Sequence, residues 1–551
     1  MATLNFKGKS FIQNHHLAVP HHEFVPKKDK SLTEKVRLDD NLIIHGDNLK
    51  ALKALLPTYA GKVKCIYIDP PYNTGNEKWI YNDSVNSPMM QEWLGKEVDR
   101  EDLTRHDKWA CMMMPRLKLL RDLLRDDGIV CISIDDNEFV NLVSLGDEIF
   151  GEHNRFGIIV VRNNPRGRRL GTELAVEHEY LVLYARSIEK FGAGRLELTE
   201  EQLLEYAETN SAGRRYRLLG LRKRGALSRK QDRPNLHYPL FVNPKDGAVV
   251  TQLGKGLIKV IPRLSDGTDG VWRWSKGKVD RESELLVARQ VKRRETGDKE
   301  WDVFQIDYPD TEDGEISGRL FPSIWQGSEF NNETGRDQIR ELFGKSIFDY
   351  PKPVDLVKHV ILLANAKDGI VLDSFAGSGT TAQAVLELNN ADGGKRQFIL
   401  AECEDYADKI TAERVRRVIK GGTSGSFSYF ELGKPIELGG ILDGKNLPSF
   451  MELARYVFYT ATGQEFDERK VDEKKFSIGS TKEYDVYLLY KPDVEFLKGT
   501  ALTLERARAL GAKNGKRRLV FAPTKYLDQD QLAEFHIDFA QLPFEIYRLA
   551  E

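Results

Sequence analysis

Residues 63–72 read Val-Lys-Cys-Ile-Tyr-Ile-Asp-Pro-Pro-Tyr, a largely apolar run that ends in Asp69-Pro70-Pro71-Tyr72. Six residues of this composition before a double proline predict a buried β-strand over 63–68. Further apolar strands and helical stretches alternate around it, at 41–44, 49–56, 104–125 and 129–134. Strands that alternate with helices are typical of an α/β fold with a parallel sheet. We therefore predict such a sheet, with Asp69 at the carboxyl end of one strand.

The α/β pattern stops near residue 155 and resumes after about 320. Between these points short strands, Gly and Pro turns and many arginines predict an inserted α+β region. Residues 421–426 have the composition of a linker. The predicted divisions are an N-terminal arm at 1–37, two core segments at 38–154 and 326–425, an insertion at 155–325, and a small C-terminal α/β domain at 426–551.

The composition limits the class of protein. With 551 residues, of which 40% are hydrophobic and 30% charged, the chain has material for three or four folded domains. Its four cysteines lack CxxC spacing, and the pairs His15-His16 and His21-His22 lack other ligands nearby, so we predict no metal site. The lack of an apolar leader or a long apolar run predicts a cytoplasmic protein. The net charge of −2 does not by itself indicate a nucleic-acid partner.

The first chemical signal is Asp69-Pro70-Pro71-Tyr72, placed directly after the strand at 63–68. Ligands of open α/β sheets bind beyond the carboxyl ends of the strands. Two prolines stiffen the backbone and remove two N–H donors, which leaves carbonyl oxygens available as acceptors. A carboxylate, a carbonyl and an aromatic face together suit a planar ring that carries an amino group. For the prolines alone, a rigid exit from the strand is the alternative. We predict that Asp69, Pro70, Pro71 and Tyr72 are catalytic.

The second signal spans 373–381, Asp-Ser-Phe-Ala-Gly-Ser-Gly-Thr-Thr, where a predicted strand enters a glycine turn and a helix. Gly377 and Gly379 allow a ligand to approach the backbone, and the helix N-terminus adds donors. No lysine precedes Thr380 as in a phosphate-binding loop, and Ala382 replaces the third glycine of a dinucleotide fingerprint. Glu402 ends the next strand, where dinucleotide folds place the acid that binds ribose hydroxyls. The pattern favours a nucleoside cofactor without phosphates over NAD or ATP.

Together, Asp-Pro-Pro-Tyr-Asn-Thr-Gly at 69–75 and the glycine turn at 373–381 resemble motifs of the amino-methylating DNA methyltransferases, whose cofactor is S-adenosylmethionine. The catalytic motif precedes the cofactor motif, which is similar to the circularly permuted β group with its target-recognition region between the two. The chain looks most like the Mod (modification) subunits of type III restriction systems over about residues 38–420. Further matches stand at 44–48, 105–109, 133–138 and 348–353.

This resemblance implies a Rossmann-like core and a role for each motif residue. Asp69 and the Pro70 carbonyl would hold the target amino group while Tyr72 stacks on a base flipped out of the duplex. The cofactor would contact Asp47, Lys352, Asp373, Phe375, Gly377, Gly379, Thr380 and Glu402. For Asp47, a simple turn residue after Gly46 is the alternative interpretation.

Adenine N6 and cytosine N4 are both exocyclic amines on six-membered rings, so the chemistry alone does not choose between them. Within the resembled family, Asp at the first motif position accompanies adenine more often and Ser accompanies cytosine. We therefore favour N6-adenine, with N4-cytosine as the alternative.

The predicted insertion carries a dense basic stretch at 213–234. Nine positive charges stand there against the single acid Asp232, which is typical of a surface that binds phosphates, although a solvated charged face is the alternative. These candidates for DNA contact are Arg214, Arg215, Arg217, Arg222, Lys223, Arg224, Arg229, Lys230 and Arg233. A second basic group consists of Arg162, Arg166, Arg168 and Arg169.

We expect duplex DNA as the partner, in a bacterial or archaeal cell. The apolar segment at 539–547 is either a dimer contact, a dock for a Res-type helicase–nuclease, or ordinary core packing. Of the dimer and the docked partner, we favour a homodimer. Two rival functions stay open. One is a non-catalytic DNA-specificity subunit that keeps the fold, and the other is a methylase of RNA or of small-molecule amines.

Overall fold

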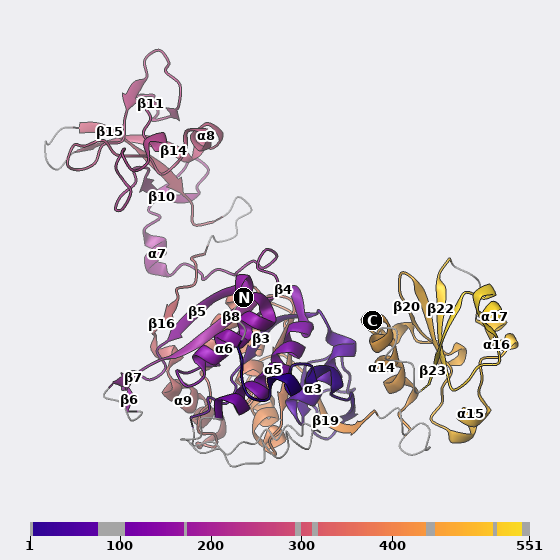
Figure 1. The fold of residues 1–551 in the computed structure, drawn as a ribbon. Coiled ribbons are helices and arrows are strands. Elements are labelled where there is room, and N and C mark those ends of the chain that lie inside the picture. Colours follow the sequence, from indigo (N-terminus) through magenta and orange to yellow (C-terminus); the bar gives the residue numbers. More distant parts are fainter. Residues whose placement is uncertain are drawn as a thin grey trace. The chain divides into compact units, whose positions relative to one another are not determined.

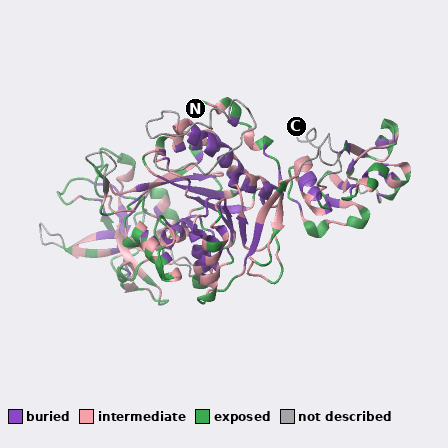
Figure 2. Cartoon of the chain, turned by 90° about the horizontal axis from the view of Figure 1, so that it is seen from below, coloured by how far each residue is buried: buried purple, intermediate pink, exposed green. Residues whose placement is uncertain are grey.

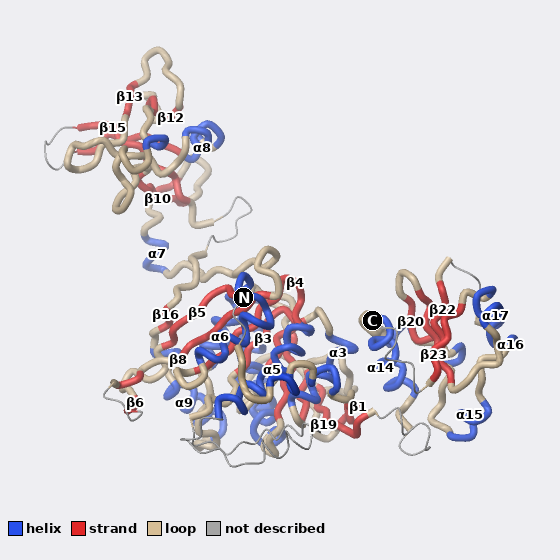
Figure 3. The backbone as a smooth tube through the Cα atoms, in the orientation of Figure 1, coloured by secondary structure: helices blue, strands red, loops and turns tan. Residues whose placement is uncertain are grey.

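A computed structural model describes residues 4–74, 105–169, 174–292, 299–310, 318–436, 447–510 and 515–542. The chain forms two compact units (Figure 1). One consists of Arg195–Phe321, and the other of Met1–Gly194 together with Pro322–Glu551. Figure 3 marks the helices and strands of each unit.

The larger unit is built on a ten-stranded sheet. Its order is β1 (His22–Pro26), β19 (Ser428–Pro435), β2 (Leu42–His45), β18 (Gln397–Glu402), β17 (Ile370–Asp373), β3 (Val63–Ile68), β4 (Leu124–Ile134), β8 (Glu179–Ala185), β5 (Arg155–Val161) and β16 (Ile324–Trp325). The run from β19 to β4 is parallel. All six residues of β3 are buried, as a strand covered on both faces requires. Figure 2 shows the buried strands of this sheet in purple.

Helices connect the parallel strands and cover them. They are α3 (Asn48–Tyr59), α5 (Arg105–Leu123), α6 (Phe139–Gly146), α9 (Asn332–Phe343), α10 (Val354–Leu363), α11 (Thr380–Asp392) and α12 (Glu413–Lys420). Leu52, Trp109, Met113 and Leu117 of α3 and α5 are fully buried in the main core beside the strands. This arrangement confirms the predicted α/β fold with a parallel sheet, and the strand at 63–68 has the predicted bounds.

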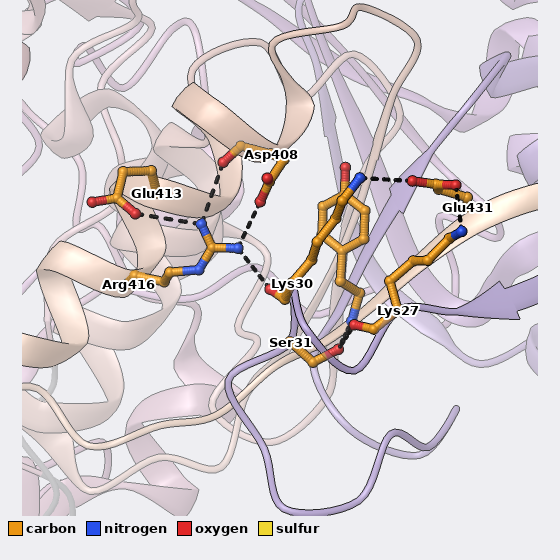
Figure 4. A network of polar contacts seen from close by, with 8 residues as sticks. Lys27, Lys30, Ser31, Asp408, Glu413, Arg416 and Glu431 are labelled. Carbon is orange, nitrogen blue, oxygen red and sulfur yellow. Dashed lines mark hydrogen bonds and ion pairs between the residues drawn. The ribbon is translucent and has the colours of Figure 1, made fainter.

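The N-terminal arm packs on the core. Strand β1 extends the sheet by pairing antiparallel with β19, and the short helices α1 (Lys9–Ile12) and α2 (His15–Ala18) precede it. Lys27 and Lys30 both bind Glu431, at 2.9 and 2.7 Å (Figure 4). The Lys30 carbonyl accepts a hydrogen bond from Arg416 at 2.6 Å. Of the histidines of this arm, His21 is buried, and its ring centroid lies 4.8 Å from that of Tyr456.

The compact inserted unit is shorter than the predicted insertion of 155–325. Strands β5 and β8, at Arg155–Val161 and Glu179–Ala185, belong to the central sheet, where they pair antiparallel with each other. Strand β16 adds Ile324–Trp325 beyond β5. The alternation of strand and helix stops near 155 because the sheet turns antiparallel at that edge, while a new compact unit begins only at Arg195.

The inserted unit has its own sheets and core. Its elements are α7 (Glu200–Leu204), β9 (Glu208–Thr209), β10 (Arg215–Gly220), β11 (Leu240–Val242), β12 (Val249–Val250), β13 (Ile258–Val260), α8 (Lys276–Arg281), β14 (Leu286–Lys292) and β15 (Lys299–Asp307). The order β14-β15-β10-β9 forms one sheet and β12-β11-β13 another. Trp272 and Val303 are fully buried in the core of this unit. The predicted α+β character therefore holds for 195–321.

The C-terminal domain begins later than residue 426. The Gly/Ser-rich stretch at 421–426 is the connection from α12 to β19, whose Tyr429 and Phe430 are buried in the central sheet. The C-terminal elements of the larger unit, which have a core cluster of their own, are α14 (Phe450–Thr462), β20 (Ser477–Ser480), β21 (Tyr484–Leu488), α15 (Val494–Gly499), α16 (Leu504–Ala509), β22 (Arg517–Ala522), α17 (Gln529–Glu534) and β23 (Ile537–Gln541). Part of the apolar segment at 539–547 lies in β23, where Ala540 is buried. Residues 543–547 lie outside the described residues.

Candidate active site

A cavity of about 660 Å³ lies at the carboxyl ends of β3, β17 and β18. Neighbouring parallel strands end at the same edge of the sheet, so motifs three hundred residues apart meet there. Of the predicted site residues, its lining includes Asp69, Pro70, Pro71, Tyr72, Lys352, Asp373, Phe375, Gly377, Thr380 and Glu402. Asp47 and Gly379 are not among the described residues that line it.

Asp69 presents an acceptor that lacks a donor. Its Oδ1 atom is buried and accepts no hydrogen bond from any described residue. The ammonium of Lys352 lies 3.3 Å from the same atom as an ionic partner. Burial raises the pKa of Asp69, and the positive charge of Lys352 opposes that rise. Buried acceptors are normally satisfied, so this oxygen fits an N–H donor that enters the cavity.

The two proline carbonyls of the motif differ in what they bind. The Pro71 carbonyl accepts a hydrogen bond from Trp109 Nε1 at 2.7 Å. Among the described residues, none donates to the carbonyl of Pro70. Next along the loop, Asn73 has a left-handed φ of 56°, and its carbonyl accepts from Arg105 Nη1 at 2.7 Å. Helix α5 therefore holds the loop so that Pro70 offers the carbonyl available to a ligand.

The buried residue Glu138 contacts the loop that contains Asn73. The carboxylate of Glu138 is fully buried. It accepts hydrogen bonds from the side chains of Asn73 and, at 2.7 Å, of Asn141. His106 Nδ1 lies 2.7 Å from the same carboxylate. The stretches 105–109 and 133–138 thus contact the loop at 71–73 through their side chains.

Glu402 has the geometry expected of a residue that binds a ribose. It ends β18, and its oxygens accept from the backbone N–H groups of Gly377 at 2.6 Å and Glu404 at 3.0 Å. Each carboxylate oxygen has two acceptor positions, so capacity for hydroxyl donors is left over. Burial raises the pKa of Glu402 to about 7. The nearby Asp373 carboxyl, which accepts from Phe375 N at 3.0 Å, has a pKa raised by burial to about 7 as well.

Two predicted cofactor residues have local structural roles. Asp47 caps helix α3, accepting from the backbone of Leu49 at 2.9 Å and of Lys50 at 3.3 Å, which fits the alternative of a turn residue. Gly379 caps α11 with φ of 82°. A Cβ at that position would lie 3.0 Å from the Thr411 carbonyl, so only glycine fits the turn. A direct contact of either residue with a ligand stays a prediction.

Lys352 lies on the Asp69 side of the cavity. Its Nζ donates to both carboxylate oxygens of Glu179 at 2.7 Å and to the Tyr72 hydroxyl at 2.6 Å. Only its backbone serves the glycine turn, since its carbonyl accepts from Thr380 Oγ1 at 3.1 Å. Glu179 was not anticipated from the sequence. The signal that could have found it is a single acid at the start of the apolar strand 179–185.

Ion pairs neutralise most of the basic stretch at 213–234. The partners are acids from 266–269 and 302–310, which are remote in sequence. The pairs are Arg214–Asp310 at 2.7 Å, Arg217–Asp307 at 2.7 Å, Arg222–Asp302 at 2.7 Å, Arg229–Asp266 at 3.7 Å and Lys230–Asp269 at 3.0 Å. The described residues place no acid in an ion pair with the other four, Arg215, Lys223, Arg224 and Arg233. Arg224 and Arg233 are exposed.

The second basic group belongs to the larger unit. Arg162 pairs with Glu177 at 2.7 Å, and Arg166, which is 85% exposed, lies 3.6 Å from Glu333. Arg168 and Arg169 form the short strand β6, which pairs with β7 (Ala175–Val176). The side chains of Arg168 and Arg169 lie outside the described residues. The contact of this group with DNA stays a prediction.

Residues 63–413 match the N6/N4 methyltransferase family, described as DNA methylase. The chain belongs to this family. It is 30% identical over 460 residues to the type III restriction-modification enzyme EcoPI Mod subunit of Escherichia phage P1, covering 78% of this chain and 70% of the relative. It is 37% identical over 358 residues to the type II methyltransferase M.KpnI of Klebsiella pneumoniae, covering 65% of this chain and 79% of the relative. These relatives confirm the resemblance to Mod subunits.

Solved structures similar to this methyltransferase include the PvuII cytosine-N4-specific DNA methyltransferase, at 11% identity and a TM-score of 0.33. That likeness covers 69% of this chain and 93% of the PvuII chain. A putative DNA modification methylase from Thermus thermophilus, complexed with S-adenosyl-L-methionine, is 13% identical with a TM-score of 0.30, covering 71% of this chain and 99% of that one. No helix of the methyltransferase is long and apolar enough to cross a membrane within its described residues.

Proposed function

We propose that this methyltransferase moves a methyl group from S-adenosylmethionine to the N6 amino group of adenine in duplex DNA, as the modification enzyme of a restriction-modification system. The observation that carries the proposal is the shared cavity. It joins Asp69, Pro70 and Tyr72 on the catalytic side to Phe375, Gly377 and Glu402 on the cofactor side. A base and a nucleoside cofactor that enter it from these two sides would meet beside Asp69.

The residues present fit S-adenosylmethionine. Glu402 has acceptor capacity for the two ribose hydroxyls, and Phe375 offers an apolar wall. When bound, this cofactor supplies a methyl group on a positively charged sulfur. The chain contributes orientation: the cofactor side and the Asp69 side belong to adjacent strands β17 and β3, so the amine and the methyl donor are held as neighbours.

Asp69 and Pro70 would hold the target amine. An exocyclic amino group has two N–H bonds, and Asp69 Oδ1 and the Pro70 carbonyl are two cavity acceptors to which no described residue donates a hydrogen bond. With both protons held, the nitrogen lone pair points away from them toward the methyl carbon. Asp69 would accept the proton that the amine releases once it has been methylated. Tyr72 would stack on the ring of the base.

The target base must leave the helix to reach this cavity, which costs a few kcal/mol. Exposed cations of the inserted unit, Arg224 and Arg233, would contribute to holding the phosphates. We further propose that the enzyme acts as a homodimer, and that a Res-type helicase–nuclease is its partner, because the chain resembles a Mod subunit over most of its length.

Sequencing of modified bases tests the function directly. A host that lacks methylation is supplied with the wild-type gene or with Asp69→Ala. We expect N6-methyladenine at one defined site with the wild type and none with the variant. Appearance of N4-methylcytosine instead would favour the alternative. A purified protein that binds S-adenosylhomocysteine and DNA but modifies no base would overturn the proposal and favour a specificity subunit.

A further inference from the structure

A buried ion pair borders the catalytic residues of this methyltransferase. Glu179 is 2% exposed and stands at the start of β8, whereas Lys352 comes from the segment before α10. The Lys352 ammonium lies 2.7 Å from each oxygen of Glu179 and 3.3 Å from Asp69 Oδ1. Burying a charge is costly unless it is paired, so the three groups constrain one another.

Tyr72 is part of the same network. Its hydroxyl accepts a hydrogen bond from Lys352 at 2.6 Å and donates one to Glu179 at 3.1 Å. Glu179 is itself held by Asn163 Nδ2 at 2.7 Å. Two bonds at one hydroxyl fix the direction of the tyrosine ring. Glu179 and Lys352 therefore hold the hydroxyl end of the ring, and the Lys352 ammonium also lies 5.0 Å from the ring centroid.

The charges around Asp69 decide its protonation. Two carboxylates, Asp69 and Glu179, share one ammonium. Without that ammonium two buried like charges would face each other, and one carboxylate would take up a proton. A protonated Asp69 has lost negative charge and cannot accept the proton of the methylated amine. The titratable groups that face Asp69 in the described residues are Lys352, Glu179, Tyr67, Tyr72 and Asp373.

We propose that Glu179 and Lys352 are positioning residues for methyl transfer. Lys352 maintains the negative charge of Asp69, and Glu179 holds both Lys352 and the Tyr72 ring in place. The proposal rests on the function proposed above, since it assumes that Asp69 accepts an N–H bond of the target. Their contacts are with Asp69 and Tyr72, so their effect would reach the reaction through those two residues.

The experiment measures single-turnover methyl transfer from tritiated S-adenosylmethionine to a duplex that carries the target site, between pH 5.5 and 9. The variants are Lys352→Met, which removes the charge at similar length, Lys352→Arg, which keeps it, and Glu179→Gln. Lys358→Met is the matched control because Lys358 is a part-buried lysine of α10, paired with Glu387, and does not line the cavity. Melting temperature and affinity for S-adenosylhomocysteine are recorded for each protein.

We expect Lys352→Met to move the acidic limb of the rate profile upward by about one pH unit or more, the usual effect of losing a nearby opposite charge. Its rate would fall about tenfold below the wild-type rate at the acidic end of this range and would recover as the pH rises. In Lys352→Arg and in the control Lys358→Met, the acidic limb of the rate profile would stay at the wild-type pH. Glu179→Gln would lower the plateau without an upward shift, since its amide oxygen still accepts from Lys352 while a negative charge beside Asp69 is removed.

If Lys352→Met lowers the rate of methyl transfer by the same factor at every pH, the proposal is overturned. Glu179 and Lys352 would then serve packing alone. An upward shift in Glu179→Gln would also overturn it, which keeps the test decisive if Lys352→Met does not fold. These outcomes differ from a failure of the proposed function, in which the wild-type protein itself transfers no methyl group to DNA.

Discussion

At the scale of single residues, burial controls the charge of the cavity. Asp69, Asp373 and Glu402 all have a raised pKa for which burial is the largest cause. Lys352 lies beside Asp69, while the described residues that donate to Glu402 do so through backbone N–H groups. Binding that depends on Glu402 should therefore vary with pH near neutrality.

We predict that affinity for S-adenosylhomocysteine falls about tenfold from pH 8 to pH 6. The pKa of Glu402 is raised to about 7, so the carboxylate that we propose as the acceptor for ribose hydroxyls is ionised above this value and protonated below it. One pH unit below the pKa leaves about a tenth of it ionised. Calorimetric titration at pH 6, 7 and 8 measures the effect.

Glu402→Gln should bind the same ligand weakly and with little dependence on pH. The exposed neighbour Asp405, changed to Asn, serves as the control and should behave like the wild type. A variant Glu402→Gln that keeps the full dependence on pH would show that another group is responsible.

At the scale of elements, strand β10 shows that charge along the sequence differs from charge on the folded surface. Its Arg217 pairs with Asp307 of β15, the adjacent strand, and Arg222 just beyond it pairs with Asp302. The acids lie some eighty to ninety residues away in sequence, so a local count of charge cannot include them. The exposed Arg224 and Arg233 are better candidates for phosphate contact than the arginines of the strand.

We predict that Arg224→Ala and Arg233→Ala each weaken DNA binding and lower the slope of log affinity against log salt by about 0.9, the loss of one phosphate contact. Arg217→Ala should leave that slope unchanged and instead lower the melting temperature, because it leaves Asp307 without its partner. Fluorescence anisotropy with a labelled duplex at several salt concentrations measures the slopes. Equal slopes in all three variants would contradict this assignment.

At the scale of the whole molecule, one compact unit is inserted into another. Residues Arg195–Phe321 have their own core, and the chain enters and leaves this unit at adjacent positions. Leu196 and Arg319 form an antiparallel bridge with hydrogen bonds of 2.9 and 2.8 Å. A short linker can therefore replace the unit without stretching the chain.

We predict that joining Gly194 to Pro322 through a short Gly-Ser linker leaves a folded protein. It should bind S-adenosylhomocysteine within about twofold of the full chain, because no described residue of the inserted unit lines the cavity. Its affinity for duplex DNA should fall by about tenfold or more, since the exposed cations are lost. Calorimetry and anisotropy measure the two affinities. Loss of cofactor binding, or retention of DNA affinity, would contradict the assignment of cofactor binding to the larger unit and DNA binding to the inserted unit.

Much of the fold followed from local pattern. The strand at 63–68, the helix that starts at Thr380 and the placement of Asp69 and Glu402 at strand ends are visible in the sequence, because apolar runs and glycine turns are local features. The sequence instead indicates that β5 and β8 belong to the insertion, since antiparallel strands lack the helix that marks a parallel crossover. The turn at 421–426 looked like a linker because composition does not distinguish the two.

The sequence by itself determined the parallel sheet, the motifs at 69–72 and 373–381, and hence the class of enzyme. Only the tertiary structure decided how those motifs act. It placed Lys352 and Glu179 beside Asp69, gave Asp47 a capping role, and paired five of the nine cations in 213–234 with acids from other segments. The physical reason is how far apart in sequence the interacting residues lie. Strand formation depends on neighbouring residues, whereas buried charge depends on whichever residues the fold brings within a few ångströms.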